Sequence, residues 1–246
     1  MTELTPFDYS HEGTALHGFL ARPAGAGPHP AALVMHDALG ISTTAKQRAR
    51  DLAALGYVAL VTDMYGGPPE SAGGLPLGKA ERGAQFAALQ AEPALFRSRI
   101  VSAFETLRGI PGVDAARIGA IGFCFGGQCV LELARSGADA KGVVSFHGLL
   151  TSRQPAEAGV VKVRMLVLTG AKDPFAPPAD VQAFQAEMAE AGGDWQMTVY
   201  GEGWHAFTDP EIETRSAGTA GLKYDPLIAG LSWAQATAFL QATVAG

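Results

Sequence analysis

Short, nearly continuous runs of apolar residues recur along the chain, and most of them end at a glycine or a polar residue. Runs of this length suit strands that are buried on both faces of a parallel sheet. We therefore predict buried strands at residues 31–35, 57–61, 118–121, 143–146, 165–168 and 197–200.

Apolar residues at helical spacing lie between these runs. One set follows an i, i+4, i+7 pattern, a second ends at a pair of glycines, and a third follows Ser232, a residue type that favours the N-cap. The sets are Ile100, Phe104 and Leu107; Val181, Phe184 and Met188; and Trp233, Ala236, Thr237 and Leu240. Because alternating strands and helices favour right-handed crossovers, we predict an α/β fold with a mostly parallel, doubly wound sheet flanked by helices.

Two segments carry no clear pattern. Residues 66–78 are rich in Gly and Pro, and residues 206–230 are long without a period. Long loops in a compact domain are uncommon and often functional, so both are candidate covers of a site, with a plain surface loop as the alternative. No repeat or linker divides the chain, and we expect one domain over residues 1–246.

The composition is that of an enzyme-sized globular protein, with 246 residues, 48% hydrophobic and 17% charged. The net charge of −6, with no Lys/Arg cluster, argues against a nucleic-acid partner. The N-terminus lacks the basic and apolar regions of a secretory signal, and no apolar stretch is long enough to span a membrane. We expect a cytoplasmic protein, monomeric or homodimeric.

The two cysteines, Cys124 and Cys129, are five residues apart. This spacing fits neither a disulfide framework nor a zinc site. Reduced thiols in a cytoplasmic protein are the simplest interpretation, and we expect no metal and no other cofactor. Cys129 falls within a predicted helix and is expected to pack in the core.

Residues 122–126, Gly-Phe-Cys-Phe-Gly, place Cys124 where a nucleophile elbow has a serine. A predicted strand precedes the motif, and a helix is predicted from Gln128 to Arg135. In such a strand–turn–helix the small flanking residues let the backbones pass, and the central side chain projects at a helix N-terminus, which favours a negative charge. The alternative is a buried cysteine in a glycine-rich turn.

A thiol nucleophile needs a base, and the base needs a group that orients it. Asp173 follows the strand predicted at 165–168, and His205 follows the one at 197–200. The carboxyl ends of parallel strands gather reactive groups, and the chain order nucleophile, acid, histidine is that of α/β-hydrolases. Together these three positions are a stronger signal than any one of them.

The chain resembles the dienelactone hydrolase family in these motifs. The likeness covers nearly the whole chain and is carried by residues 34–40, 62–65, 122–127, 170–178 and 204–207. It implies a single-domain α/β-hydrolase fold and hydrolysis of a small-molecule ester or lactone. It also implies a triad of Cys124, His205 and Asp173, with the backbone N–H groups of Phe125 and Ala38 as the oxyanion hole.

Three positions bear on the substrate. Asp37 stands where the family commonly has a glutamate that interacts with the resting thiol, and it is one methylene shorter. Asp209 stands four residues after His205, where founding members have an arginine that binds a substrate carboxylate. Arg82 is the match to a second family arginine. We therefore expect a neutral substrate, with Arg82 as a substrate-binding residue.

Further residues near the motifs are candidates for the substrate pocket: His36, Tyr65, Phe123, Trp204 and Phe207. Each aromatic side chain alone is more often part of the core. For His36, at a strand end beside the oxyanion loop, hydrogen bonding to its surroundings is favoured over catalysis. For His147, at another strand end, pocket lining or a structural role is favoured over chemistry.

Other functions remain open at this level. Glutaminase domains also carry Gly-x-Cys-x-Gly, but they have a glutamate two residues after the histidine, where this chain has Phe207. A non-catalytic small-molecule-binding protein on a hydrolase scaffold is the main alternative, because a fold alone does not fix function. A side activity on neutral phosphotriesters is also expected, since a thiolate attacks phosphorus as well as carbon.

Overall fold

The computed structural model describes residues 2–67 and 78–246, so most of the segment 66–78 lies outside the described residues. The chain forms two compact units, Met1–Ala120 and Ile121–Gly246. Strand β5 (Val113–Phe123) runs through the boundary. The prediction of one domain over 1–246 stays a prediction, and each unit is described by itself.

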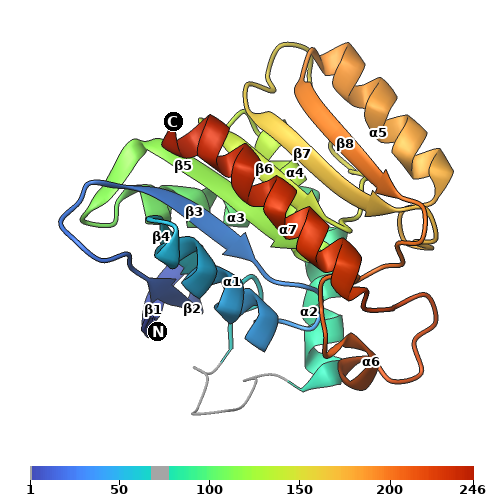
Figure 1. Ribbon diagram of the computed structural model, residues 1–246, viewed down its shortest axis with the longest axis horizontal. Coiled ribbons are helices and arrows are strands. Elements are labelled where there is room, and N and C mark those ends of the chain that lie inside the picture. Colours follow the sequence, from blue (N-terminus) through green and yellow to red (C-terminus); the bar gives the residue numbers. More distant parts are fainter. Residues whose placement is uncertain (1, 68–77) are drawn as a thin grey trace. The chain divides into compact units, whose positions relative to one another are not determined.

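The first unit has four strands before β5, in the order β1-β2-β4-β3. Strands β3 and β4 pair in parallel, while β2 pairs antiparallel with both β1 and β4. Helices α1 and α3 lie on opposite faces of these strands, and α2 packs on α3 (Figure 1). The elements are β1 (Leu4–His11), β2 (Thr14–Ala21), β3 (His29–Met35), α1 (Thr43–Ala54), β4 (Val58–Val61), α2 (Lys79–Ala91) and α3 (Pro93–Arg108).

The two central strands of this unit match the predicted apolar runs. Every residue of β4 is buried, as are the last five of β3, because helices cover both faces. In β1 exposed and half-buried positions largely alternate, and in β2 half-buried and buried positions largely alternate, as expected of an antiparallel pair at a sheet edge. Helix α1 begins where the Ser42 hydroxyl accepts from the Ala45 N–H at 3.1 Å.

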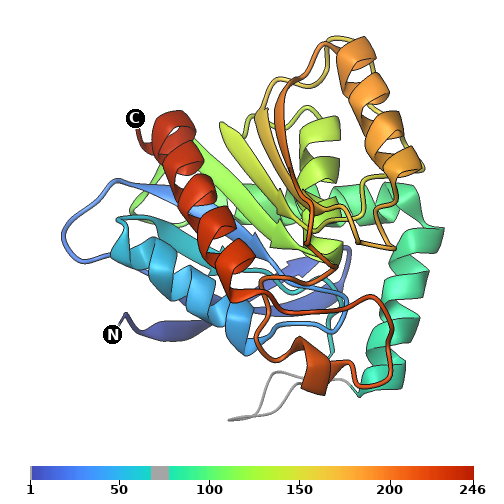
Figure 2. The same ribbon diagram turned by 45° about the vertical axis from the view of Figure 1, so that its right-hand side comes forward.

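The second unit continues from the end of β5 into α4. Strands β6, β7 and β8 pair in parallel in that order. Helix α4 packs on one face of β6 and α7 on the other, which Figure 2 shows from a second side. The elements are α4 (Phe125–Arg135), β6 (Gly142–Phe146), β7 (Arg164–Gly170), α5 (Pro178–Ala191), β8 (Asp194–Tyr200), α6 (Ile212–Arg215) and α7 (Pro226–Leu240), which a π-helical turn, Gln241–Ala245, follows.

The start of the last helix differs from the sequence prediction. Helix α7 begins at Pro226, with Asp225 as its N-cap, and the Asp225 carboxylate accepts from the N–H groups of Leu227 and Ile228. Proline suits the first helical position because the N–H that it lacks has no partner there anyway. Ser232, the predicted cap, lies inside the helix and donates to the Ala229 carbonyl at 3.0 Å. Among residues 2–67 and 78–246, no helix is both long and apolar enough to cross a membrane.

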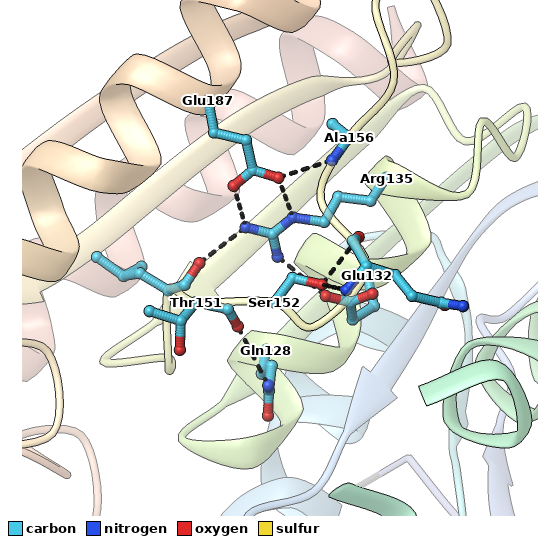
Figure 3. A network of polar contacts seen from close by, with 9 residues as sticks. Gln128, Glu132, Arg135, Thr151, Ser152, Ala156 and Glu187 are labelled. Atoms are coloured by element: carbon cyan, nitrogen blue, oxygen red, sulfur yellow. Dashed lines mark hydrogen bonds and ion pairs between the residues drawn. The ribbon is translucent and has the colours of Figure 1, made fainter. Parts of the chain in front are cut away.

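A buried ion-pair network fixes α4 to its surroundings (Figure 3). The Arg135 guanidinium donates to both carboxylate oxygens of Glu187 on α5, at 2.8 and 2.7 Å. It also donates to Glu132 at 3.1 Å and to the Leu150 carbonyl at 2.7 Å. Glu187 in turn accepts from the Ala156 N–H at 2.8 Å. The network therefore joins α4, α5 and the segment between β6 and β7.

Replacing Arg135 with leucine is expected to lower the free energy of unfolding by about 3–5 kcal/mol, because it leaves the buried Glu132 carboxylate without its cation. Urea unfolding of parent and variant measures the difference. The matched control is Arg164→Leu, whose ion pair with Asp194 is exposed, and its cost is expected to be about 1 kcal/mol or less. Equal costs for both variants would contradict a stabilising role for the network.

Candidate active site

Cys124 sits at a sharp turn between β5 and α4. Its backbone has φ 55° and ψ −114°, a conformation that residues other than glycine rarely adopt. A Cβ on Gly122 would lie 1.9 Å from the Gly126 carbonyl oxygen, so glycine is required for the chain to turn this tightly. Helix α4 starts at the next residue, Phe125, which places the half-buried thiol at a helix N-terminus.

His205 and Asp173 form a buried hydrogen-bonded pair. His205 Nδ1 lies 2.8 Å from Asp173 Oδ2, and both side chains are almost fully buried. Since a carboxylate only accepts, Nδ1 carries the proton of this bond. The other carboxylate oxygen accepts from the Phe175 N–H at 2.8 Å, which fixes the orientation of Asp173.

The His205 ring also forms a hydrogen bond with the Cys124 side chain. Because Asp173 occupies Nδ1, this bond uses Nε2. Burial lowers the pKa of His205, but the charge of Cys124 and the hydrogen bonds with Asp173 and Cys124 outweigh burial and raise the pKa to about 10. The structure thus brings together the three predicted residues, with an imidazole that favours its protonated form beside the thiol.

The segment after β8 is held by backbone hydrogen bonds around His205. The His205 N–H donates to the Gly221 carbonyl at 3.2 Å, and its carbonyl accepts from Lys223 at 3.1 Å. Residues 221–223 therefore run beside the histidine, within the segment 206–230 that was a candidate cover of the site. Gly221 also packs closely on Pro174, the residue after Asp173.

Cys129 lies one turn into α4 and is fully buried. Burial raises the pKa of its thiol well above the usual range, and the charges of Glu132 and Cys124 add to the rise. Cys124 is half-buried, whereas Cys129 is fully buried, which agrees with the interpretation of Cys129 as a core residue.

The other predicted site residues of the first unit gather around one tight turn, residues 37–40. The Asp37 carboxylate accepts from the Leu39 N–H at 2.7 Å, and the Gly40 N–H donates to the Asp37 carbonyl at 3.0 Å. The Tyr65 hydroxyl donates to the Ala38 carbonyl at 3.0 Å. The side chain of Arg82, on α2, packs on Gly40.

His36 is bonded to backbone groups through both ring nitrogens. Nε2 accepts from the Met64 N–H at 3.1 Å, and Nδ1 donates to the Asp37 carbonyl at 2.6 Å. The ring also contacts Tyr65 edge-on, with 4.9 Å between centroids. These contacts favour the hydrogen-bonding role of His36 over a catalytic one, and they hold the turn that carries Ala38.

A model of the dienelactone hydrolase family matches residues 16–244. The chain belongs to the dienelactone hydrolase family. The family prediction and its α/β-hydrolase fold are confirmed, and the chain is a hydrolase of this type. The family match favours a hydrolase over a glutaminase domain and over a non-catalytic binding protein.

Two solved structures resemble this dienelactone hydrolase family member over nearly its whole length. The protein named m3DLH is 35% identical, with a TM-score of 0.88 and 99% of each chain covered. A dienelactone hydrolase-like promiscuous phosphotriesterase from metagenomic libraries is 32% identical, with a TM-score of 0.89 and 98% of each chain covered. A protein named "Probable 2-oxo-3-(5-oxofuran-2-ylidene)propanoate lactonase", from Bradyrhizobium sp., is 29% identical over 243 residues, which are 95% of this chain and 92% of that protein.

Within this family member, the predicted aromatic residues differ in exposure. Phe207 is fully buried, with its ring 4.9 Å from that of His147, and Phe123 stacks on Phe146 at 4.8 Å. Trp204 is half-buried. Phe175, two residues after Asp173, is 41% exposed, and its ring centroid lies 4.7 Å from that of His205.

The sequence did not single out Thr208, and for His147 it favoured pocket lining or a structural role over chemistry. The Thr208 hydroxyl lies 2.8 Å from His147 Nε2, and both residues are buried. His147 Nδ1 accepts from the Cys124 N–H at 3.2 Å. The only sequence signal for His147 was its place at a strand end, and Thr208 carried none.

Proposed function

We propose that this dienelactone hydrolase family member hydrolyses ester or lactone bonds of small, neutral molecules through Cys124, His205 and Asp173. The observation that carries the proposal is the buried histidine between a carboxylate and a thiol at a helix N-terminus. Its pKa of about 10 favours an imidazolium next to the Cys124 side chain. A thiolate is the nucleophilic form of cysteine.

In the first half-reaction the Cys124 sulfur forms a bond to the substrate carbonyl carbon. The carbonyl oxygen becomes an oxyanion, for which the backbone N–H groups of Phe125 and Ala38 are the proposed donors. Support comes from Phe125 being the first residue of α4, since first-turn N–H groups have no carbonyl partner within a helix. Collapse expels the alcohol, which takes its proton from His205 and leaves an acyl-thioester.

Formation of the acyl-thioester changes the role of His205. The charge of Cys124 is the largest of the influences that raise the pKa of His205, and it disappears when the sulfur is acylated. Burial, which lowers the pKa of His205, is then opposed only by the hydrogen bond with Asp173 and by its charge. The neutral imidazole that results can take a proton from water, and the hydroxyl attacks the thioester carbonyl. The C–S bond then breaks, which releases the carboxylic acid and returns the Cys124 thiolate beside a protonated His205. The same histidine thus acts first as acid and then as base.

A neutral substrate is proposed because Asp209 occupies the position where the founding members have their arginine. Asp209 is buried and pairs there with Arg215, so the pair carries no net charge. The chain as a whole carries −6, which repels anions. Arg82, on α2 and packed on Gly40 of the turn that carries Ala38, is the counter-candidate for anion binding.

A panel of matched esters and lactones, each neutral or carrying one carboxylate, is expected to give higher kcat/KM for the neutral member of each pair. Steady-state rates of parent and Arg82→Ala measure this. Arg82→Ala is expected to leave the ratio between the pair members unchanged. A preference for the anions would contradict the neutral substrate, and a failure to turn over any member would contradict ester and lactone hydrolysis.

A second proposed activity is the hydrolysis of neutral phosphotriesters. It is supported by the likeness to a dienelactone hydrolase-like promiscuous phosphotriesterase at 32% identity. A triester carries no charge to repel a thiolate, and donors that hold a carbonyl oxyanion also face the charge on a phosphoryl oxygen. The exposed ring of Phe175 beside His205 suits an aryl leaving group.

An aryl dialkyl phosphate is expected to release its aryl alcohol steadily over many turnovers, because a thiolate is a better leaving group than an alkoxide in the second step. Time-resolved absorbance of the released alcohol measures this. Release of one equivalent, with a lasting mass shift on Cys124, would show inhibition in place of catalysis, and no release would rule the activity out.

The proposed setting is the cytoplasm, with a small-molecule ester as the partner. Both cysteines are free thiols, as expected in a reducing compartment. Monomer and homodimer both remain expectations.

A further inference from the structure

His147 is a buried imidazole beside the triad that the proposed mechanism does not use. It follows the last residue of β6, and only 2% of its surface is exposed. Its backbone has φ 38°, a left-handed conformation for a non-glycine residue. Among the residues that the structure describes, four non-glycine residues have positive φ, and Cys124, His147 and Ala206 are three of them. Strained conformations of this kind persist where surrounding contacts hold them.

The hydrogen bonds of His147 fix its tautomer. Nδ1 lies 3.2 Å from the backbone nitrogen of Cys124, and an N–H can only donate, so Nδ1 carries the lone pair. The proton is therefore on Nε2, which donates to the Thr208 hydroxyl at 2.8 Å. The His147 backbone N–H donates to the Leu168 carbonyl at 2.7 Å, which anchors the residue to β7.

The surroundings of His147 keep this ring neutral. Burial lowers its pKa well below the usual value, and the positive charge of His205 lowers it further. The ring lies edge-on to His205, with 5.2 Å between centroids and 66° between planes. It also meets Phe207 edge-on at 4.9 Å. One neutral ring therefore contacts both the backbone of the nucleophile and the side chain of the base.

We propose that His147 is a positioning residue. It holds the backbone N–H of Cys124 through its unprotonated Nδ1 and packs against His205. These two contacts keep the Cys124 sulfur and the His205 imidazole correctly placed relative to each other. The Cys124 N–H is shared between this nitrogen and the Phe146 carbonyl, at 3.0 Å. Without Nδ1 one acceptor of this shared bond is lost, at the residue whose backbone is strained. The inference rests on the proposed function, since it assigns a partner to the same nucleophile.

Three variants separate the acceptor from the bulk of the side chain. Leucine and asparagine have nearly the same shape, but only asparagine offers an oxygen near the place of Nδ1, and asparagine tolerates positive φ. Glutamine serves as a second variant without the Nδ1 acceptor, because its amide reaches toward the place of Nε2. Each variant is assayed for kcat and KM with one ester, for the rate of Cys124 alkylation by iodoacetamide, and for urea unfolding.

We expect His147→Leu and His147→Gln to lower kcat about 100-fold with KM unchanged, the size of loss that small misplacements of reacting groups produce. Their alkylation rates should fall as well. His147→Asn should restore kcat and alkylation to within a few-fold of the parent. A purely structural role would lower the urea midpoint and leave kcat per folded enzyme unchanged.

Cys124→Ala, measured in parallel, distinguishes failure of this inference from failure of the proposed function. If Cys124→Ala is inactive while the leucine, glutamine and asparagine variants share one kcat, the acceptor is irrelevant and the inference is overturned. If Cys124→Ala is active, the proposed function falls, and the inference falls with it.

Discussion

Replacement of Cys124 with alanine is expected to abolish ester turnover, with a loss of kcat of about 10⁶-fold, as for the removal of a triad nucleophile elsewhere. The fold should be unaffected, because the side chain is half-buried and its hydrogen bond with His205 is the interaction that alanine removes. Steady-state hydrolysis of an aryl ester measures the loss, and urea unfolding verifies the fold.

The matched control is Cys129→Ala, five residues along the same chain segment. Cys129 is fully buried and burial raises its pKa, so this variant is expected to keep kcat. For the same reason iodoacetamide should label Cys124 well before Cys129 in the parent. Activity in Cys124→Ala, or labelling of Cys129 first, would contradict the assignment of the nucleophile.

Asp173→Asn is expected to lower kcat by about 10⁴-fold while KM changes little. The carboxylate accepts the Nδ1 proton of His205 at 2.8 Å, whereas an asparagine amide in the same place can donate to that nitrogen. Donation would place the proton on Nε2 and remove the lone pair that the mechanism needs there. Asp180→Asn, in the first turn of α5, is the matched control and should retain the parent rate.

The same variant has an expected pH signature. In the parent, hydrogen bonding to Asp173 is one cause that raises the pKa of His205 to about 10. A group whose pKa is raised keeps its proton until the pH passes that value, so the parent should lose kcat/KM only as the pH approaches about 10. In Asp173→Asn this alkaline limb is expected at lower pH. An unmoved limb, or a rate close to the parent, would mean that another carboxylate orients His205.

The parts of the fold that could be predicted are those whose physical cause lies within a short stretch of sequence. Strands β3, β4, β6 and β7 are covered on both faces, so their apolar runs are nearly continuous. The pattern of β1 and β2 is weaker, because one face of each strand is less buried than the other and polar residues mix with apolar ones. The cap of α7 was misplaced because Ser232 and Asp225 are equally good caps by type, and only the path of the preceding segment decides between them.

The candidate site divides in the same way. Cys124, Asp173 and His205 were predicted because each lies within a few residues after the end of a strand, and parallel strands bring such positions together. His147 contacts Cys124, 23 positions before it, and Thr208, 61 positions after it, and no local sequence pattern predicts these contacts. Likewise, the pairing of Asp209 with Arg215 depends on the fold of the segment after β8.

The most direct test of the account is the isolation of the acyl-enzyme. The parent is mixed with an aryl ester of a slowly hydrolysed acid, quenched in acid during the burst of aryl alcohol, digested and analysed by mass spectrometry. The account predicts one equivalent of alcohol in the burst and the mass of one acyl group on the peptide with Cys124, released by hydroxylamine and absent from Cys124→Ala. Turnover with no burst and no adduct, or an acyl group on another residue, would contradict it.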